Sequence, residues 1–159
     1  MTEWLRRAGR GRLRDGSVVT WTVAEGNRGR RWRWTLSQDD RLAVVGLIEL
    51  APDGLFGRLE LALANALVTF HPDDDRRAAH GNVVTNGGVR PIAVPWAAGW
   101  GIGIEGDAFA SAVGGAGSVG LRFGRDLSWT ANVELAASLA LDERGVPRLE
   151  DAAEWPLEE

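Results

Sequence analysis

The chain has 159 residues, enough for one domain with its own hydrophobic core, and a net charge of −4. It has no cysteine, which excludes disulfides and thiolate metal sites, and no apolar run long enough to span a membrane, so we expect a cytoplasmic protein. The charge is unevenly distributed, because residues 1–34 hold nine arginines against three acidic residues. A basic end of this kind can bind nucleic acid or another acidic partner.

The first part of the chain divides into a basic segment and a hairpin. Residues 1–16 lack apolar periodicity and contain five arginines, which predicts a loose basic arm ahead of a single domain at 17–159. Residues 18–24 and 30–36 alternate between apolar and polar side chains, the pattern of strands with one buried face. The residues between them are rich in Gly and Asn, so the two strands form a predicted hairpin.

Strand patterns continue in the middle of the chain. Residues 42–50 are apolar at both odd and even positions, as in a central strand. Residues 55–70 fit a helix as well as strands, and we favour two strands, at 57–63 and 67–70.

A second hairpin is predicted around a glycine-rich turn. Asn86-Gly87-Gly88 is a strong turn signal between apolar segments at 81–85 and 89–94. Because proline has no backbone N–H, Pro91 and Pro95 restrict the second strand to the edge of a sheet or to a bulged position. Further on, residues 100–104 alternate Trp or Ile with Gly, and Asp107 is placed to cap a short helix at 108–113.

The longest alternation lies near the C-terminus. Every odd position from Leu127 to Leu141 is apolar, after a shorter strand pattern at 119–123, and this predicts one long strand that bends near 136–138. Residues 151–155 are expected to form a final helical turn. We therefore predict a mostly β fold: a single antiparallel, strongly curved sheet, a half-barrel or barrel, with one or two short helices.

No motif supports catalysis. The sequence Gly101-Ile-Gly-Ile-Glu-Gly106 matches a dinucleotide-binding pattern, but the predicted helix after it is too short for that site. His71, Asp73–Asp75 and His80 could gather around a metal ion, yet Pro72 followed by three acidic residues is equally typical of a solvated turn. We expect no enzyme activity, no cofactor and no metal site.

Arginine and tryptophan alternate in the second predicted strand. Arg31 and Arg33 fall on one face, and Trp32 and Trp34 on the other. Phosphate contacts and base stacking would need both kinds of residue on the same face, so buried tryptophans under solvated arginines are the simpler interpretation. Nucleic-acid binding stays an alternative.

Two segments carry a family resemblance. The stretch Thr85-Asn86-Gly-Gly-Val-Arg90-Pro-Ile92 and the terminal stretch from Leu141 to Leu149 resemble segments of the bacterial glycolipid-binding protein family. The resemblance implies a long, strongly curved antiparallel sheet like that of lipoprotein carriers, and a glycolipid-like ligand. It points to Asn86, Arg90 and the terminal hairpin as binding elements.

The leading functional hypothesis is non-enzymatic binding of an apolar or amphiphilic small molecule on the concave face of the sheet. A head group would meet an arginine at the rim, Arg90 or Arg122. Two alternatives stay open: binding of nucleic acid or an acidic partner through the N-terminal arginines, and a structural domain that forms homo-oligomers through its sheet edges. The expected lining of the cavity consists of tryptophans: Trp21, Trp34, Trp100 and Trp129.

Overall fold

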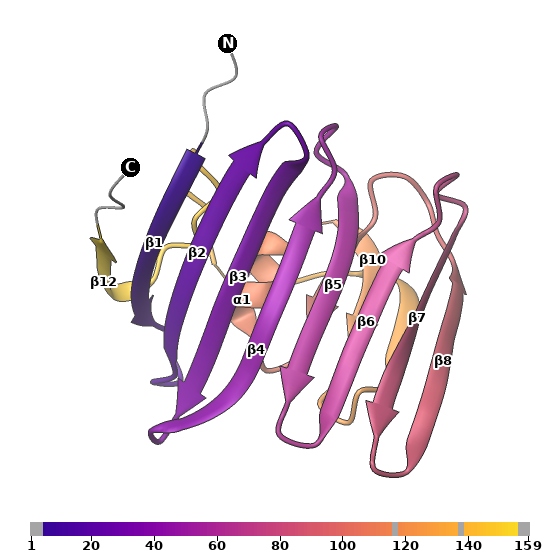
Figure 1. The fold of residues 1–159 in the computed structure, drawn as a ribbon, viewed down its shortest axis with the longest axis horizontal. Helices are drawn as coiled ribbons and strands as arrows, with labels where there is room; N and C mark the ends of the chain where they lie inside the picture. Colours follow the sequence, from indigo (N-terminus) through magenta and orange to yellow (C-terminus); the bar gives the residue numbers. More distant parts are fainter. Residues whose placement is uncertain (1–4, 116–117, 137–138, 156–159) are drawn as a thin grey trace.

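The computed structural model describes residues 5–115, 118–136 and 139–155. It confirms a mostly β fold, with two sheets and one helix in those ranges (Figure 1). The large sheet has the strand order β12-β1-β2-β3-β4-β5-β6-β7-β8, and the small sheet has the order β11-β10-β9. The elements are β1 (Leu5–Arg12), β2 (Val18–Gly26), β3 (Gly29–Gln38), β4 (Arg41–Leu50), β5 (Phe56–Leu63), β6 (Ala66–Pro72), β7 (Ala78–Thr85), β8 (Gly88–Pro95), β9 (Gly101–Ile104), α1 (Ala108–Val113), β10 (Val119–Phe123), β11 (Trp129–Glu134) and β12 (Glu150–Trp155).

The large sheet is an antiparallel meander from β1 to β8, in which each strand pairs with the one before it. Both predicted hairpins are confirmed, and so are the central strand β4 and the choice of two strands, β5 and β6, for residues 55–70. The prolines of β8 do lie on an edge strand, as predicted. The sheet stays open, because its two end strands, β12 and β8, are not paired with each other.

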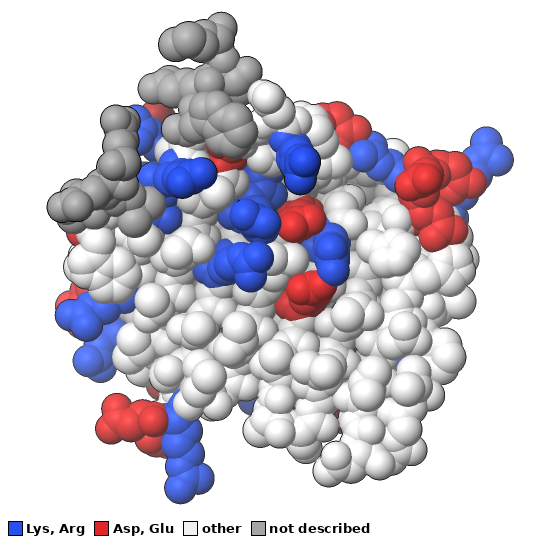
Figure 2. Space-filling view, in the orientation of Figure 1, with Lys and Arg blue, Asp and Glu red and all other residues white. Residues whose placement is uncertain are grey.

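The inner face of the large sheet is the one that carries the predicted tryptophans. Trp21 and Trp34 are cross-strand neighbours on β2 and β3, and both are buried. Their rings lie over Gly9 and Gly46, where any larger side chain would overlap the indole. The strict alternation of these strands thus produces one dry face, and the outer face holds the polar partners of the alternation, seen toward the viewer in Figure 2.

A second layer covers this inner face. It consists of the small sheet, α1 and the segment 139–149, which lie behind the large sheet in Figure 1. Aromatic contacts join the two layers: the rings of Trp34 and Phe109 are 5.5 Å apart, and those of Phe70 and Phe123 are 6.1 Å apart. The inner face is therefore packed against the protein's own chain.

The N-terminal arm differs from its prediction. Leu5–Arg12, expected to be part of a loose arm at 1–16, instead forms β1 between β2 and β12. The strand pattern is hidden in the sequence because Gly9 and Gly11 occupy inner positions, where the side chains of Trp21 and Leu149 fill the space above them. A glycine at an inner position removes the apolar residue that periodicity would detect.

The C-terminal half also differs from its prediction. The alternating stretch 127–141 yields only a six-residue strand, β11. Leu127, with a φ angle of 63°, precedes the strand and is not extended, and Asn132, with a φ angle of 58°, lies within it where the pairing with β10 shifts register. The expected bend at 136–138 lies in part outside the described residues. Residues 150–155 form β12, a fully exposed strand, and the predicted helical turn at 151–155 is wrong.

The small sheet adds a feature that the single-sheet prediction lacks. Its strands β9 and β10 are parallel and are joined by α1, whereas β10 and β11 are antiparallel. The predicted cap is confirmed, since Asp107 accepts a hydrogen bond from the backbone N–H of Ala110.

Candidate functional site

The predicted site residues fall into separate places, and two of them belong to the core. Trp21 and Trp34 are only 3% and 2% exposed. The indole N–H of Trp34 donates to Oδ2 of Asp107 over 2.9 Å, so its polar atom is satisfied inside the protein. In this structure both tryptophans pack the two layers together rather than line an open space.

Asp107 is the buried polar centre of this packing. Its side chain is 3% exposed, and each carboxylate oxygen accepts one hydrogen bond, from Trp34 and from the backbone of Ala110. Burial raises the pKa of Asp107, and the two hydrogen bonds partly oppose that rise. The residue therefore joins the start of α1 to β3, a role that a sequence spacing of 73 residues concealed.

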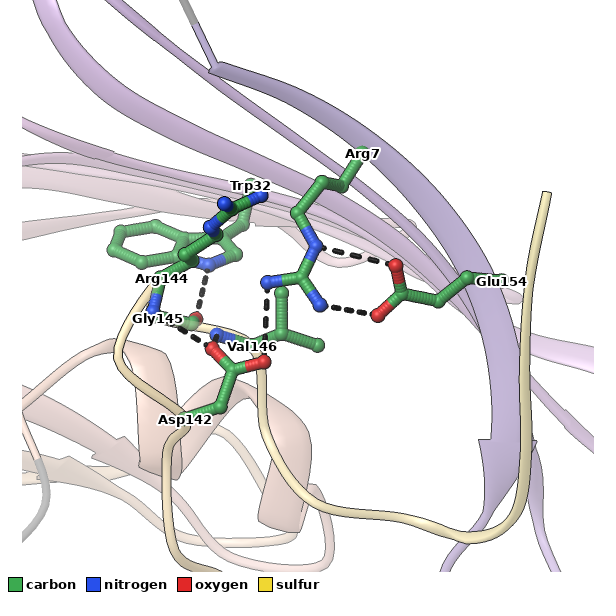
Figure 3. Close-up of polar contacts among 7 residues, drawn as sticks. All are labelled: Arg7, Trp32, Asp142, Arg144, Gly145, Val146 and Glu154. Atoms are coloured by element: carbon green, nitrogen blue, oxygen red, sulfur yellow. Dashed lines mark hydrogen bonds and ion pairs between the residues drawn. The ribbon is translucent and has the colours of Figure 1, made fainter. Parts of the chain in front are cut away.

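The terminal hairpin, the second element of the family resemblance, is held by a polar cluster (Figure 3). Arg7 of β1 donates to Asp142 over 3.0 Å and to Glu154 of β12 over 3.2 Å. Beside it, the indole N–H of Trp32 donates to the carbonyl of Gly145 over 2.8 Å. The hairpin is thus attached to the inner face through β1 and β3, by the Asp142 carboxylate and the Gly145 carbonyl.

Asp142 organises the turn itself. Its Oδ1 accepts hydrogen bonds from the backbone N–H groups of Arg144 and Val146, with N–O distances of 2.9 and 3.0 Å. Burial alone would raise the pKa of Asp142, but these hydrogen bonds and the contact with Arg7 outweigh it and lower the pKa. The carboxylate is consequently ionised across the neutral range and pairs with the Arg7 guanidinium.

Trp100 lies at the end of an aromatic cluster. Its ring is 5.5 Å from that of Trp96, which in turn contacts Phe56 and Phe70 at 5.7 and 5.4 Å. Trp96 was not singled out from the sequence, because it follows Pro95 in a segment without strand periodicity. Trp100 is half-buried, so it closes the cluster toward the solvent.

Arg90 and Trp129 are brought together from the two sheets. The Arg90 guanidinium of β8 lies 5.8 Å from the centroid of the Trp129 ring of β11, a cation–π contact. On β11, Trp129 and Ala131 are half-buried and pack against the core, whereas Thr130 between them is exposed. We call Arg90 together with this half-buried apolar row the β8–β11 seam.

The charge of the seam is set by Arg90. It is exposed and forms no ion pair with any residue in the described ranges. The charge of Arg90 also acts on Asp126. The hydrogen bonds from Ser128 are the main cause of the lowered pKa of Asp126, and the positive charge of Arg90 lowers that pKa further. Arg90 therefore presents beside apolar surface a cation that has no ion-pair partner in the described ranges, although Asp126 lies in its field.

The remaining predicted residues lie elsewhere. Asn86 is exposed in the two-residue turn between β7 and β8. Arg122 of β10 pairs with Thr130, so it lies on the face of the small sheet opposite to Trp129, where it lines a groove of about 460 Å³ with Gly103 and Leu135. The structure thus unites Arg90 with Trp129 and separates Arg122 from both.

The metal and nucleotide patterns resolve into structural roles. His71 and His80 are cross-strand neighbours, and Nδ1 of His80 lies 2.7 Å from Oδ1 of Asp73. Within the described ranges no three potential ligands come together. In the glycine motif, Gly101 and Gly103 lie inside β9. At the start of α1, the carboxylate of Asp107 accepts the backbone N–H of Ala110, where a nucleotide-binding helix would bind a phosphate.

The part of the chain that the structure describes contains one helix, α1. No helix in that part is long and apolar enough to cross a membrane. No family model matches the chain, and neither a curated protein nor a solved structure matches it.

Proposed function

We propose that the protein is a non-enzymatic binder of an amphiphilic small molecule, one with an apolar chain and an anionic head group, at the β8–β11 seam. The observation that carries the proposal is the position of the Arg90 guanidinium over Trp129, 5.8 Å from the ring centroid, beside an apolar row that is half open to solvent. The head group would bind Arg90, and the chain would lie along Trp129 and Ala131.

The chemistry of the seam suits both halves of such a molecule. Binding is stabilised by about 25 cal/mol for each Å² of accessible apolar surface that the ligand removes from water. An arginine binds a carboxylate or phosphate through two parallel hydrogen bonds, which adds direction to the charge interaction. The resemblance of Asn86–Arg90 to the bacterial glycolipid-binding family supports the same class of ligand, since Arg90 belongs to that segment.

Pairing between sheet edges, the oligomeric alternative, is disfavoured at β8. Thr85 and Gly88 flank a two-residue turn and therefore form a hydrogen-bonded pair. Because such pairs alternate along an antiparallel ladder, every second residue of β8, counted from Gly88, forms backbone hydrogen bonds with β7. The residues between them turn their backbone nitrogens toward the free edge, and two of these are Pro91 and Pro95. An edge that lacks these donors is a poor template for another strand.

The nucleic-acid alternative is disfavoured by the faces of β3. Trp32 and Trp34 lie on the buried inner face, and Arg31 and Arg33 point to the outer face. Bases have no indole to stack on beside these arginines, although stacking supplies much of the affinity of single-strand binders. A small ligand at the seam fits the described geometry better.

The test is a titration with dodecanoate, followed by tryptophan emission and by the melting temperature. Binding should shift the emission to shorter wavelength and raise the melting temperature through mass action on the folded state. Arg90→Gln should weaken binding by about tenfold to 100-fold, the value of a hydrogen bond to a charged group. Dodecanol, which has no charge, should bind the wild type and Arg90→Gln equally.

Arg122→Gln is the matched control, because it removes the same charge from the opposite face of the small sheet. It should leave dodecanoate binding unchanged. An equal loss in both variants would show a general charge effect instead of a site, and no response of the wild type to dodecanoate would remove the proposal.

A further inference from the structure

An exposed apolar row crosses the outer face of the large sheet. The row follows the strand register from β4 to β8, where each member is the cross-strand partner of the next: Val45, Ala62, Leu67, Val84 and Val89. The larger members are well exposed, with Val45 at 42%, Leu67 at 54% and Val89 at 59%. We call this row the apolar stripe, and Figure 2 shows the lower centre and lower right of this face as a broad area without charge.

An arginine patch adjoins the stripe on the same face. The register places Arg6, Arg31 and Arg58 in one row across β1, β3 and β5, with Arg33 in the next row. Figure 2 shows these charges gathered in the upper centre of the face. Arg28 joins them at the end of the β2–β3 hairpin, where a groove of about 580 Å³ is lined by Arg6, Arg28 and Arg31.

The patch keeps an excess of positive charge. Arg58 is paired with Glu60, and Glu49 lies between Arg31 and Arg58 in the register. Arg31 and Arg33 form no ion pair with a residue in the described ranges. This face is thus basic although the whole chain carries −4.

The two surfaces are close enough to act together. Arg33 is two residues from Thr35, the cross-strand partner of Val45, and Arg31 is four residues away. At about 3.4 Å per residue, the arginines lie roughly 7 and 14 Å along the strand from the row of the stripe. An interface between lipid head groups and acyl chains offers phosphates and apolar matter over a similar distance, since interfacial elements bury about 5–10 Å deep.

We propose that this outer face docks on an anionic lipid surface. The apolar stripe enters the boundary of the acyl chains, and the arginine patch binds lipid phosphates. The inference is independent of ligand binding at the seam, because the seam lies between the two sheets and the docking surface lies on the opposite face of the large sheet.

Charge and composition favour lipid over the other occupants. A second copy would offer this patch few carboxylates, because its own face is also basic, whereas every anionic phospholipid supplies a phosphate. From β2 to β8 the outer face presents neither Trp nor Phe, so a single-stranded nucleic acid would find charge without a stacking platform.

The experiment is co-sedimentation of the full chain with vesicles of phosphatidylcholine, with and without phosphatidylglycerol. We expect binding only to the vesicles with phosphatidylglycerol, and weaker binding as salt increases. The double variant Arg31→Gln/Arg33→Gln should weaken binding by about 25-fold, on the basis of about fivefold per arginine near an anionic surface. Leu67→Glu should weaken it by about tenfold, because it places a charge on the stripe.

Matched controls remove the same groups from the covering segment. Arg144→Gln/Arg148→Gln and Leu141→Glu alter exposed residues of the segment 139–149 and should bind vesicles like the wild type. Arg90→Gln should also bind them normally, which separates this test from that of the seam. Circular dichroism melts of all variants confirm that they are folded.

Several results would overturn the inference. These are equal binding to neutral and anionic vesicles, no binding by the wild type, or equal binding by wild type and the outer-face variants. A concentration-dependent mass that Leu67→Glu abolishes, without vesicle binding, would assign the face to a second copy. Oligonucleotide binding without vesicle binding would assign it to nucleic acid.

Discussion

At the scale of single residues, Asp107 combines two functions that usually belong to different side chains. It caps α1 through the N–H of Ala110, and it accepts the indole N–H of Trp34 from the other layer. A buried carboxylate is costly unless its oxygens are hydrogen-bonded, and here both are. The contact between the layers therefore depends on a group whose charge can change.

The substitution Asp107→Asn tests this arrangement. The amide nitrogen cannot accept, so one of the two N–H donors is left without a partner, and the variant should lose about 1–3 kcal/mol of unfolding free energy. The pH dependence has a defined sign. Because burial raises the pKa of Asp107 above the value of about 3.9 in an unfolded chain, the folded state binds this proton more tightly.

The stability of the wild type relative to Asp107→Asn should accordingly fall as pH rises from about 3.9 through the folded pKa. Urea denaturation of both proteins at a series of pH values measures this difference. A constant difference across the series would mean that Asp107 keeps an ordinary pKa. A difference that grows with pH would mean that its pKa is lowered.

The sequence reveals half of what Asp107 does. An aspartate directly before a short apolar segment is a recognisable N-cap, and this prediction is confirmed. Its bond to Trp34 could not be foreseen, because periodicity says that Trp34 is buried and gives no indication of what covers it. The same limit applies to Arg7, whose partners Asp142 and Glu154 are more than 130 residues away along the chain.

At the scale of elements, β11 shows how far alternation can mislead. The stretch 127–141 alternates throughout, yet only Trp129–Glu134 is a strand. A segment without regular strand structure can also bury apolar side chains where it crosses another layer. The segment 139–149 does so, since Val146 belongs to the core and Leu139 packs against it. Period-two patterns therefore locate burial more reliably than they locate strand ends.

Burial predicts unequal effects for two tryptophans. Trp34 is almost fully buried, so Trp34→Ala should cost about 3–5 kcal/mol of unfolding free energy. Trp129 is half-buried, so Trp129→Ala should cost about half of that or less. Thr130 is exposed, and Thr130→Ala should stay within about 0.5 kcal/mol as the matched control. Chemical denaturation gives all three values, and a larger cost at Trp129 than at Trp34 would contradict the burial shown.

The strand β1 gives a second element-scale prediction. Deleting residues 1–12 should remove the cooperative thermal transition, because β1 joins β2 to β12 and carries the Arg7 contacts with Asp142 and Glu154. Removing only the charge, with Arg7→Gln, should lower the melting temperature and keep the transition cooperative. Circular dichroism melts distinguish the two, and an unchanged transition in the deletion would show that β1 contributes little.

At the scale of the whole molecule, the strands β2 to β8 of the meander were predictable, whereas β1 and the second layer were not. Local signals indicate the strands β2 to β8, because each is followed by a short turn and then by its own partner. The covering layer depends on contacts between distant segments, such as Phe70 with Phe123. For the candidate site, the sequence selected Arg90 and Trp129 separately, and only the structure places one over the other.

The pairing of β1 with β12 also has a consequence for synthesis. The first strand of the chain borders the last, so one side of β1 has no neighbour until residue 155 has been made. At 5–20 residues per second, a ribosome leaves that side open for roughly 10–30 s. The arginines at positions 6, 7, 10 and 12 give the unpaired strand β1 a dense positive charge, and charged residues on a free strand edge discourage its association with other nascent chains. We therefore expect the arginines of β1 to limit aggregation during synthesis, until β12 is available to pair with β1.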